Sequence, residues 1–234
     1  MNILVTAGHT RAMIDQVRTL ENIFHGRTGC ALASQLALAG HKVVLLASDP
    51  KQLPGNACDK NIEVCPFRSF DDLEGTMREM ITYRKFDVII HSSAVADYKP
   101  TGRTFVYNPE ETGEDGLPKL KLLPARGKIP SGYTRLLPEL EPTIKLVDLI
   151  REPLGFKGIL VKFKLQVDAQ DGQPMTDEEL IKIATNSREH SDADVIVANC
   201  LAWADTHAIV IGRDNVPNKI LRSQLFGTLA RMFQ

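Results

Sequence analysis

The chain has 234 residues and a formal net charge of −1, because its 28 basic and 29 acidic residues nearly cancel. This length is enough to bury a full core, and it predicts one α/β domain over 1–234 with an insertion at about 99–135, in preference to two small domains. The balanced charge, with no Lys/Arg cluster along one face, excludes a general nucleic-acid-binding surface.

The sequence also has no feature of a membrane or secreted protein. No apolar run approaches the roughly 20 residues that span a bilayer, and the N-terminus lacks a basic region followed by an apolar signal core. We therefore expect a cytoplasmic protein that does not contact membranes. The four cysteines have no metal-ligand spacing and are expected to be small buried hydrophobic residues: Cys30, Cys58, Cys65 and Cys200.

The first predicted element is a buried parallel strand, Ile3-Leu4-Val5-Thr6, followed by Gly8 where the backbone must turn. In a dinucleotide-binding fold, a G-x-G-x-x-G sequence spans this turn and the helix starts almost at once. Here a long loop precedes the glycines of 26–29, which open a predicted helix over 30–39. The spacing therefore predicts a phosphate site of a different kind.

The next elements alternate in the manner of a doubly wound fold. Strands are predicted at 42–46, 62–66 and 86–90, with a helix that Ser69 and Asp72 cap and that runs to about residue 84. The segment 91–98 then leaves the carboxyl end of a sheet strand, where such folds bind ligands. We expect an α/β, Rossmann-like, mostly parallel sheet.

Residues 99–135 are rich in glycine and proline and lack a helical period, too long a stretch for a passive connection in a compact domain. Two short runs within it, 104–107 and 119–123, predict the strands of a projecting β-hairpin arm. Such an arm could close over a site or pair with a second subunit.

After Pro142 the alternation resumes. A short helix to about residue 150, a strand over 158–165 and a helix capped by Thr176 with Glu179 are followed by strands at 194–199 and 207–211. Ser223 is expected to cap a last helix.

The glycines at 26–29 are the first candidate site. The first-turn N–H groups of a helix have no intrahelical partner, so Gly26 and Gly29 could cradle an anion, with Arg27 as a charged donor. The same glycines could instead only permit a tight turn. Asn22, just upstream, could point its amide into the same space or remain a solvated loop residue.

Further candidates lie in loops. Asp15 and Arg18, three residues apart, either pair with each other or contact a ligand. Asp97 follows a strand end, where a carboxylate could orient a ribose or Mg²⁺, and Lys128 is a mobile cation suited to a reacting phosphate. Phe163 could contact a base, while Lys162 and Lys164 point to the other face of the strand; core packing is the simpler role for Phe163.

Several of these segments together resemble one family, phosphopantothenoylcysteine synthetase, which in many bacteria is the C-terminal half of a bifunctional flavoprotein of coenzyme A biosynthesis. The family's TAGGT, PIDPVR and SNxSSGKMG or DNFSSGRRG blocks are similar to TAGHT, MIDQVR and ENIFHGRTG here. Later family blocks are similar to SSAVADY (92–98), GKIPS (127–131), PTIKL (142–146), VKFKLQV (161–167) and VIVAN (195–199). The likeness covers nearly the whole chain.

The resemblance implies a ligase that activates the carboxylate of 4'-phosphopantothenate with CTP or ATP and Mg²⁺, and then joins it to cysteine. It implies that Asn22 holds the acyl-nucleotidylate and that Lys128 contacts the triphosphate. It also implies a homodimer whose arms complete each other's sites. The positions matched to nucleotide or phosphate contacts in the family are Gly8, Gly26, Gly29, Ser93, Asp97 and Phe163.

Three departures from the family pattern leave alternatives open. Phe24 and His25 replace paired serines, His9 replaces a glycine, and two lysines that contact the nucleotide in bacterial members are Ser187 and Ser191. The choice between CTP and ATP is therefore not assigned, nor are the metal ligands. A non-catalytic paralogue that binds nucleotide or phosphopantothenate is the first alternative. An NAD(P) oxidoreductase with Asp49 on the ribose is the second, although it lacks the G-x-G-x-x-G sequence.

Overall fold

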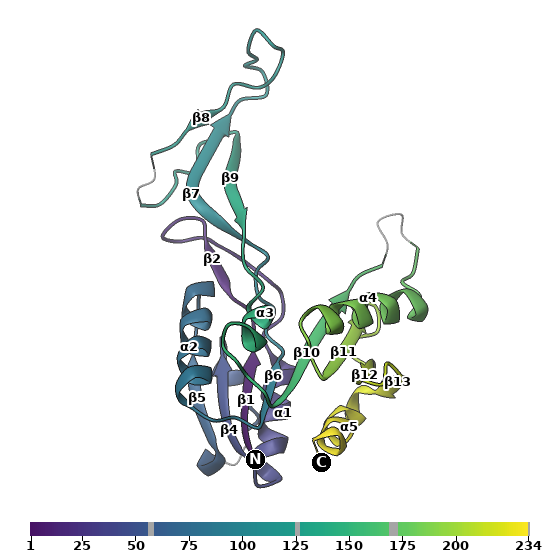
Figure 1. Ribbon diagram of the computed structural model, residues 1–234. Coiled ribbons are helices and arrows are strands. Elements are labelled where there is room, and N and C mark those ends of the chain that lie inside the picture. Colours follow the sequence, from purple (N-terminus) through teal and green to yellow (C-terminus); the bar gives the residue numbers. More distant parts are fainter. Residues whose placement is uncertain (56–58, 125–126, 169–172, 234) are drawn as a thin grey trace.

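The computed structural model describes residues 1–55, 59–124, 127–168 and 173–233. Its centre is an eight-stranded sheet in the order β13-β12-β11-β10-β6-β1-β4-β5 (Figure 1). The strands from β11 to β5 run parallel, and β12 and β13 are antiparallel to their neighbours. The strand bounds are β1 (Asn2–Ala7), β4 (Lys42–Ala47), β5 (Ile62–Pro66), β6 (Val88–His91), β10 (Ile159–Gln166), β11 (Val195–Cys200), β12 (His207–Ile211) and β13 (Pro217–Leu221).

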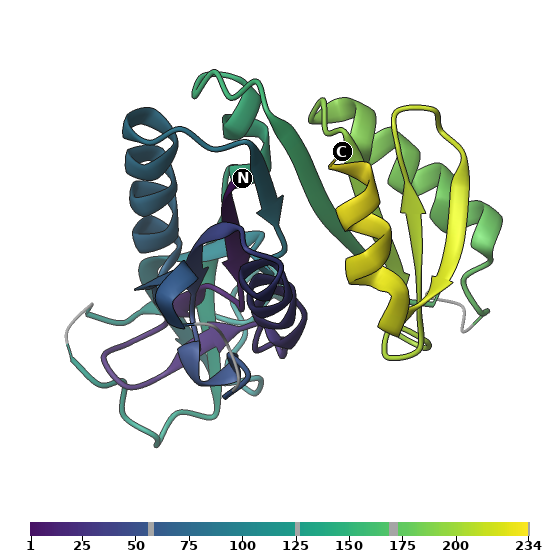
Figure 2. The same ribbon diagram turned by 90° about the horizontal axis from the view of Figure 1, so that it is seen from below.

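Helices cover both faces of this sheet, which confirms the predicted doubly wound fold. On one face, Val5 and Ile90 pack with α1 (Arg27–Leu38) and α5 (Leu225–Met232). On the other, Leu4 and Ile89 pack with α2 (Phe70–Tyr83) and α3 (Leu146–Arg151). The helix α4 (Asp177–His190) covers β11 and β12, so that α4 and α5 flank the C-terminal strands (Figure 2). Strands buried on both faces explain the continuous apolar runs in the sequence.

The chain reverses direction across the sheet at β1. From β1 it proceeds through α1 to β4 and β5 on one side, and α2 then returns it to β6 on the other side of β1. Thr6 lies beside His91 in the register, so the carboxyl ends of β1 and β6 are adjacent. Ligands of open α/β sheets bind at such a switch point.

The long connection between β1 and α1 forms a small hairpin of β2 (Arg11–Met13) and β3 (Thr19–Glu21). The following helix starts earlier than the predicted 30–39, at Arg27, directly after Gly26 in the left-handed conformation. Its first turn therefore includes the glycine-rich sequence itself.

The insertion forms the projecting arm, a three-stranded sheet in the order β8-β7-β9 that extends away from the main sheet (Figure 1). The predicted pairing of 104–107 with 119–123 is confirmed in part, because β7 (Tyr98–Tyr107) pairs with β8 (Lys121–Leu122). The longer partner of β7 is β9 (Arg135–Pro142), which the sequence did not predict. Residues 125–126 of the insertion lie outside the described residues.

The helix termini test the capping predictions. The capping boxes of Ser69 with Asp72 and of Thr176 with Glu179 are both confirmed. The expected Ser223 cap is wrong: a 3₁₀ turn, Arg222–Gln224, precedes α5, and Gln224 Oε1 accepts from Leu221 N at 3.1 Å. Two further 3₁₀ turns of the same length are Pro50–Gln52 and Asp59–Asn61.

Among the described helices, none combines the length and apolar character needed to cross a bilayer. Cys30 and Cys200 are buried and Cys65 is half-buried, and all three are free thiols, as expected for small core residues. Cys58 lies outside the described residues.

Candidate functional site

Three glycines bring the end of β1, the start of α1 and the end of β6 into close contact. Gly8 (φ +94°) directly follows β1 and Gly26 (φ +89°) precedes α1, and a Cβ on Gly26 would lie 2.4 Å from Gly8 N. A Cβ on Gly8 would lie 2.0 Å from the Oγ of Ser48, and one on Gly29 would lie 2.5 Å from the Oγ of Ser92. Both the backbone conformation and the space therefore require glycine at Gly8 and Gly26.

The first turn of α1 faces this junction with its N–H groups. The first intrahelical bond is Cys30 N to Gly26 O at 3.0 Å, and no side chain caps the helix. The first turn contains no acidic residue. Arg27, its first residue, is exposed. An uncapped N-terminus next to an arginine is the kind of site that suits a negatively charged group, and the anion site expected there stays a prediction.

The exit from β6 supplies a hydroxyl and an amide. Ser93 N donates to Thr6 Oγ1 at 3.2 Å, whereas the buried Ser93 Oγ has no hydrogen-bond partner within the described part of the chain. Ala94 N donates to Gly8 O at 2.7 Å, and Asn22 Nδ2 donates to Ala94 O at 3.1 Å. The structure thus brings Gly8, Gly26, Gly29, Asn22 and Ser93 together at the switch point.

The residues that replace the family's serines do not fill the junction. Phe24 is 37% exposed and His25 is exposed. The buried side chain is His9, which is 1% exposed and places Nδ1 2.8 Å from Phe24 O. Because a carbonyl oxygen can only accept, Nδ1 carries the hydrogen. The sequence treated His9 only as a departure, and the structure shows that it holds the 22–26 segment against β1.

The other ring nitrogen of His9 faces the β2–β3 hairpin. Nε2 lies 3.5 Å from Glu21 Oε2, and the same carboxylate oxygen lies 3.0 Å from Arg11 Nε. Nε2 is buried and has no hydrogen-bond partner among the described residues, so the hydrogen bond to Phe24 O is the contact by which His9 holds the neighbouring segment.

Asp97 and Lys128 lie on two other segments, the exit from β6 and the connection between β8 and β9. Asp97 forms a short ion pair with Lys145, and its side chain is 66% exposed. Lys128 is exposed, and within the described residues its ammonium forms no hydrogen bond or ion pair. Its neighbour Ile129 is bound by Asp15 and Arg18, which pair with each other at 3.3 Å between Oδ2 and Nη1.

Phe163 is partly buried and packs against the core on the α1 side of the sheet. Lys162 points to the opposite face, as predicted, and is only 7% exposed. Its ammonium donates to Ser187 O at 2.9 Å and to Ser191 Oγ at 2.8 Å. A lysine of β10 thus supplies a cation beside the two serines that replace lysines of bacterial family members.

One basic residue near the site, Arg222, belongs to no recognisable sequence motif. Arg222 Nη1 donates to Asn199 Oδ1 at 2.8 Å, and Nη2 makes a short hydrogen bond to Thr28 Oγ1 in the first turn of α1. Burial lowers the pKa of this guanidinium. Arg222 thus links the end of β11 to the start of α1, a contact between segments far apart in the chain that no local motif encodes.

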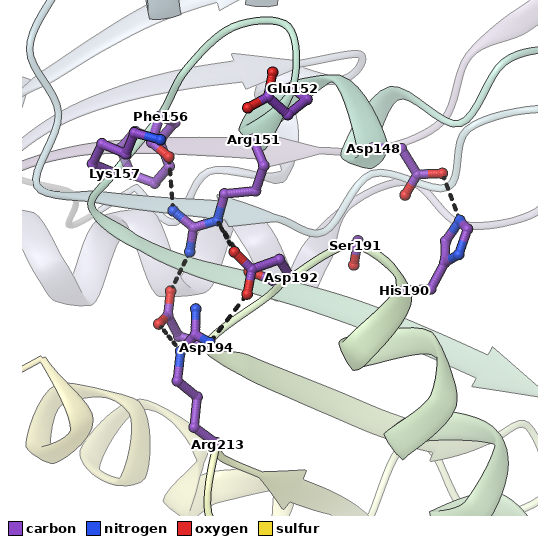
Figure 3. Close-up of a pocket in the computed structure, with 10 residues that line it drawn as sticks. All are labelled: Asp148, Arg151, Glu152, Phe156, Lys157, His190, Ser191, Asp192, Asp194 and Arg213. Carbon is purple, nitrogen blue, oxygen red and sulfur yellow. Dashed lines mark hydrogen bonds and ion pairs between the residues drawn. The ribbon is translucent and has the colours of Figure 1, made fainter.

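A pocket of about 400 Å³ lies at the opposite, amino end of β10 and β11 (Figure 3). Arg151 donates there to Phe156 O, Gly158 O and Asp194 Oδ2 at 2.8, 2.9 and 2.6 Å. Arg213 Nε donates to Asp194 Oδ1 at 2.6 Å. Because these charged side chains pair with one another, we interpret them as a structural ion-pair network that lines the pocket.

The described residues contain no group of three or more His, Cys, Asp or Glu side chains that could hold a metal ion. Mg²⁺ usually binds through one or two carboxylates together with substrate phosphates. A magnesium ion carried by a triphosphate is therefore compatible with the site, and Asp97 is the one carboxylate of the β6 exit segment, 91–98.

Comparisons with known proteins agree with this architecture. Residues 1–105 match the family described as DNA/pantothenate metabolism flavoprotein C-terminal domain. The Coenzyme A biosynthesis bifunctional protein CoaBC of Thermococcus kodakarensis is 29% identical over 215 residues, which cover 91% of this chain and 45% of that protein. The chain thus spans less than half the length of the curated relatives that it matches.

Solved structures extend the likeness to the whole chain. The DNA/Pantothenate Metabolism Flavoprotein from Streptococcus pneumoniae has a TM-score of 0.80 at 27% identity, covering 100% of this chain and 98% of that one. A mutant of Cab2 in complex with phosphopantothenate-cysteine shares the fold, with a TM-score of 0.72 at 14% identity over 99% of this chain and 86% of that one. The resemblance predicted from the motifs is confirmed: residues 1–105 match the DNA/pantothenate metabolism flavoprotein C-terminal domain, and the solved structures extend the likeness in fold over the rest of the chain.

Proposed function

We propose that the chain is a nucleotide-dependent acid–amine ligase that joins 4'-phosphopantothenate to cysteine through an acyl-nucleotidylate formed from CTP or ATP. The observation that carries the proposal is the approach of Gly26 to Gly8 at the uncapped start of α1, at the switch point of the sheet. The names of the relatives, which include CoaBC and a Cab2 complex with phosphopantothenate-cysteine, support the substrate class.

The reaction places two anions in contact. A carboxylate oxygen attacks the α-phosphorus of the nucleotide and pyrophosphate leaves; the cysteine amine then attacks the acyl carbon, the nucleotide leaves and an amide forms. The first step needs groups that offset the repulsion between carboxylate and triphosphate. The first-turn N–H groups of α1 are proposed to bind the phosphates, with Arg27 and Lys128 as the nearby cations.

The second step needs a group that holds the acyl-nucleotidylate. Asn22 donates one of its two amide hydrogens to Ala94 O, which leaves the second hydrogen and the carbonyl oxygen for a ligand. The unpartnered hydroxyl of Ser93 lies one residue away from that carbonyl. We therefore assign Asn22 to the intermediate and Ser93 to the nucleotide.

The remaining assignments extend this proposal. Asp97 and Phe163 are assigned to the nucleotide, and Mg²⁺ is assigned to the triphosphate that carries it, where it would neutralise phosphate charge. The proposal includes a homodimer, because the arm exposes apolar side chains that a partner could cover: Leu120, Leu122, Leu137 and Leu140. Sedimentation of the purified protein tests the homodimer, and a monomer at all concentrations would contradict it.

A second candidate is a paralogue that binds nucleotide or phosphopantothenate without turnover. The replacement of two serines by the exposed Phe24 and His25 favours it, since two hydroxyl donors are lost from the junction. The NAD(P) oxidoreductase alternative has less support. Asp49, its proposed ribose ligand, already accepts from Gln52 Nε2 at 2.9 Å and from Lys51 N at 3.3 Å.

Release of pyrophosphate from CTP and from ATP tests the proposal, with phosphopantothenate and cysteine supplied or omitted. The ligase requires pyrophosphate that depends on phosphopantothenate, with an amide product that depends on cysteine. Nucleotide binding by calorimetry without pyrophosphate release would favour the paralogue. The absence of both binding and turnover with either nucleotide would refute the ligase and a nucleotide-binding paralogue, and calorimetry with phosphopantothenate would then test the phosphopantothenate-binding paralogue.

A further inference from the structure

One ion pair in the crossover loop binds both backbone groups of a single residue in the arm. Asp15 Oδ2 accepts from Ile129 N at 3.1 Å, and Arg18 Nη2 donates to Ile129 O at 2.9 Å. Asp15 and Arg18 also contact each other at 3.3 Å. Two side chains of the β2–β3 loop therefore act on Ile129 as a neighbouring strand would, although more than 100 residues separate them in sequence.

The Asp15 carboxylate is also held by hydrogen bonds within its own loop. Asp15 Oδ1 accepts from Val17 N at 2.8 Å and from Arg18 N at 2.7 Å, and the Asp15 side chain is 2% exposed. The backbone hydrogen bond from Val17 is the main cause of a lowered pKa at Asp15; those from Ile129 and Arg18 add to it, and burial opposes them. Asp15 is thus charged at neutral pH and held in one rotamer.

The residue before Ile129 is Lys128. Gly127 is in the left-handed conformation (φ +69°), and Lys128 is exposed with no ion pair to a described residue. Consecutive Cα atoms are about 3.8 Å apart, so fixing Ile129 confines the origin of the Lys128 side chain. The connection between β1 and α1, which contains Asp15 and Arg18, also carries Asn22 at the junction with β6.

We propose that Asp15 and Arg18 are positioning residues that hold the Lys128 segment against the crossover loop, and so set the position of the Lys128 ammonium relative to the nucleotide. The role of Lys128 in this statement rests on the proposed function. The contact of Asp15 and Arg18 with Ile129 does not depend on the proposed function, and it can be tested by itself.

Asp15→Asn is the informative variant. Asparagine keeps one oxygen to accept from Val17 and Arg18, so the local turn is preserved. Its NH₂ group then faces Ile129 N, from which it cannot accept, and the charge that pairs with Arg18 is removed. Arg18→Lys keeps the positive charge and loses the fork that reaches both Ile129 O and Asp15. Lys128→Ala is the matched control, since it removes the ammonium and leaves the Ile129 contacts.

The first measurement is amide hydrogen exchange at Ile129, with thermal unfolding as the test of folding. We expect Asp15→Asn to speed exchange at Ile129 by about 10-fold or more, because a buried charge-assisted hydrogen bond is lost. Lys128→Ala should leave this exchange unchanged. Equal exchange at Ile129 in the wild type and Asp15→Asn would overturn the hold itself.

The second measurement is a double-variant cycle on pyrophosphate release. We expect Asp15→Asn to lower kcat by about 10-fold with a smaller change in KM for the nucleotide, and to have no further effect on the Lys128→Ala background. Arg18→Lys should restore part of the rate that Arg18→Ala loses. An Asp15→Asn effect that persists without Lys128 would overturn the positioning role.

The two proposals fail in different ways. If the wild type releases no pyrophosphate, the ligase assignment fails, and the cycle is measured on the affinity for ATP and CTP instead. The inference then requires that Asp15→Asn weakens nucleotide binding only when Lys128 is present. Equal affinities in all four proteins would contradict it.

Discussion

His91, the last residue of β6, makes the stability of the protein depend on pH. It is 7% exposed, and Nδ1 lies 3.0 Å from Thr6 Oγ1. Burial lowers the pKa of His91 from 6.5 to about 4, and the nearby ammonium of Lys162 adds to the effect. The folded state therefore holds His91 neutral, while the unfolded chain protonates it near its ordinary pKa.

The sign and size of the effect follow from proton linkage. Between the folded pKa of about 4 and the unfolded value of 6.5, the unfolded chain binds more protons. The stabilisation is therefore complete above about pH 6.5 and is lost as the pH falls toward 4. Each pKa unit corresponds to about 1.4 kcal/mol, so the free energy of unfolding should fall by about 3 kcal/mol across this window.

The assay is urea unfolding, followed by circular dichroism, at several pH values between 4 and 8, for the wild type and His91→Asn. Asparagine keeps a polar atom near Thr6 and cannot titrate in this range. Carboxylates also titrate at the acidic end, so the measured quantity is the difference between the two proteins. Parallel stability curves would refute the assignment of a neutral buried histidine.

Three further predictions concern the site directly. Lys128→Ala should slow nucleotidyl transfer by at least about 10-fold, roughly 1.4 kcal/mol of barrier, with folding unaffected; an unchanged single-turnover rate would remove Lys128 from the reaction. His9→Gln should destabilise the protein by about 1–3 kcal/mol more than His9→Asn in urea unfolding, because only asparagine places a donor near the Nδ1 position that serves Phe24 O. Equal losses of stability in the two variants would show that this hydrogen bond is not the important contact of His9. Gly26→Ala should lower the free energy of unfolding more than Gly40→Ala does, since both glycines have φ near +90° but only a Cβ on Gly26 meets backbone atoms. The control, Gly40→Ala, should lose about 1–2 kcal/mol because of its left-handed backbone, and similar losses at both positions would show that the contact with Gly8 relaxes easily.

The main sheet could be predicted from the sequence because its information is local. Runs such as Val43 to Leu46 are buried on both faces, and the boxes at Ser69 and Thr176 mark helix starts within a few residues. The strand β9, in contrast, contains prolines and acidic residues and is half-exposed. It exists because β7 supplies its partner over most of its length, which is a tertiary effect that no local propensity reports.

The candidate site divides in the same way. Gly8 and Gly26 could be located because a strand end and a helix start are visible in the sequence, whereas Ser93 was assigned through the family resemblance. The hold of Asp15 and Arg18 on Ile129 was not predicted, since spacing favours their mutual pairing and gives no sign of a third residue. His9 and Arg222 were missed as contacts for the same reason: their partners, Phe24 O and Asn199, lie on other segments.

The two halves of the site are built with different tolerance for change, and this difference predicts how variants should behave. The junction of Gly8 with Gly26 is a contact between main chains that leaves no room for a Cβ, so it can move only if the fold moves. The Lys128 segment is an exposed loop of the arm, and the Asp15–Arg18 ion pair of the β2–β3 loop holds it through Ile129. Substitutions at the glycines should therefore lower stability and rate together, whereas substitutions at Asp15 or Arg18 should change the rate and leave the unfolding midpoint nearly constant. A variant of Asp15 that lost stability and rate in proportion would show that the arm is part of the folding core and not an adjustable half of the site.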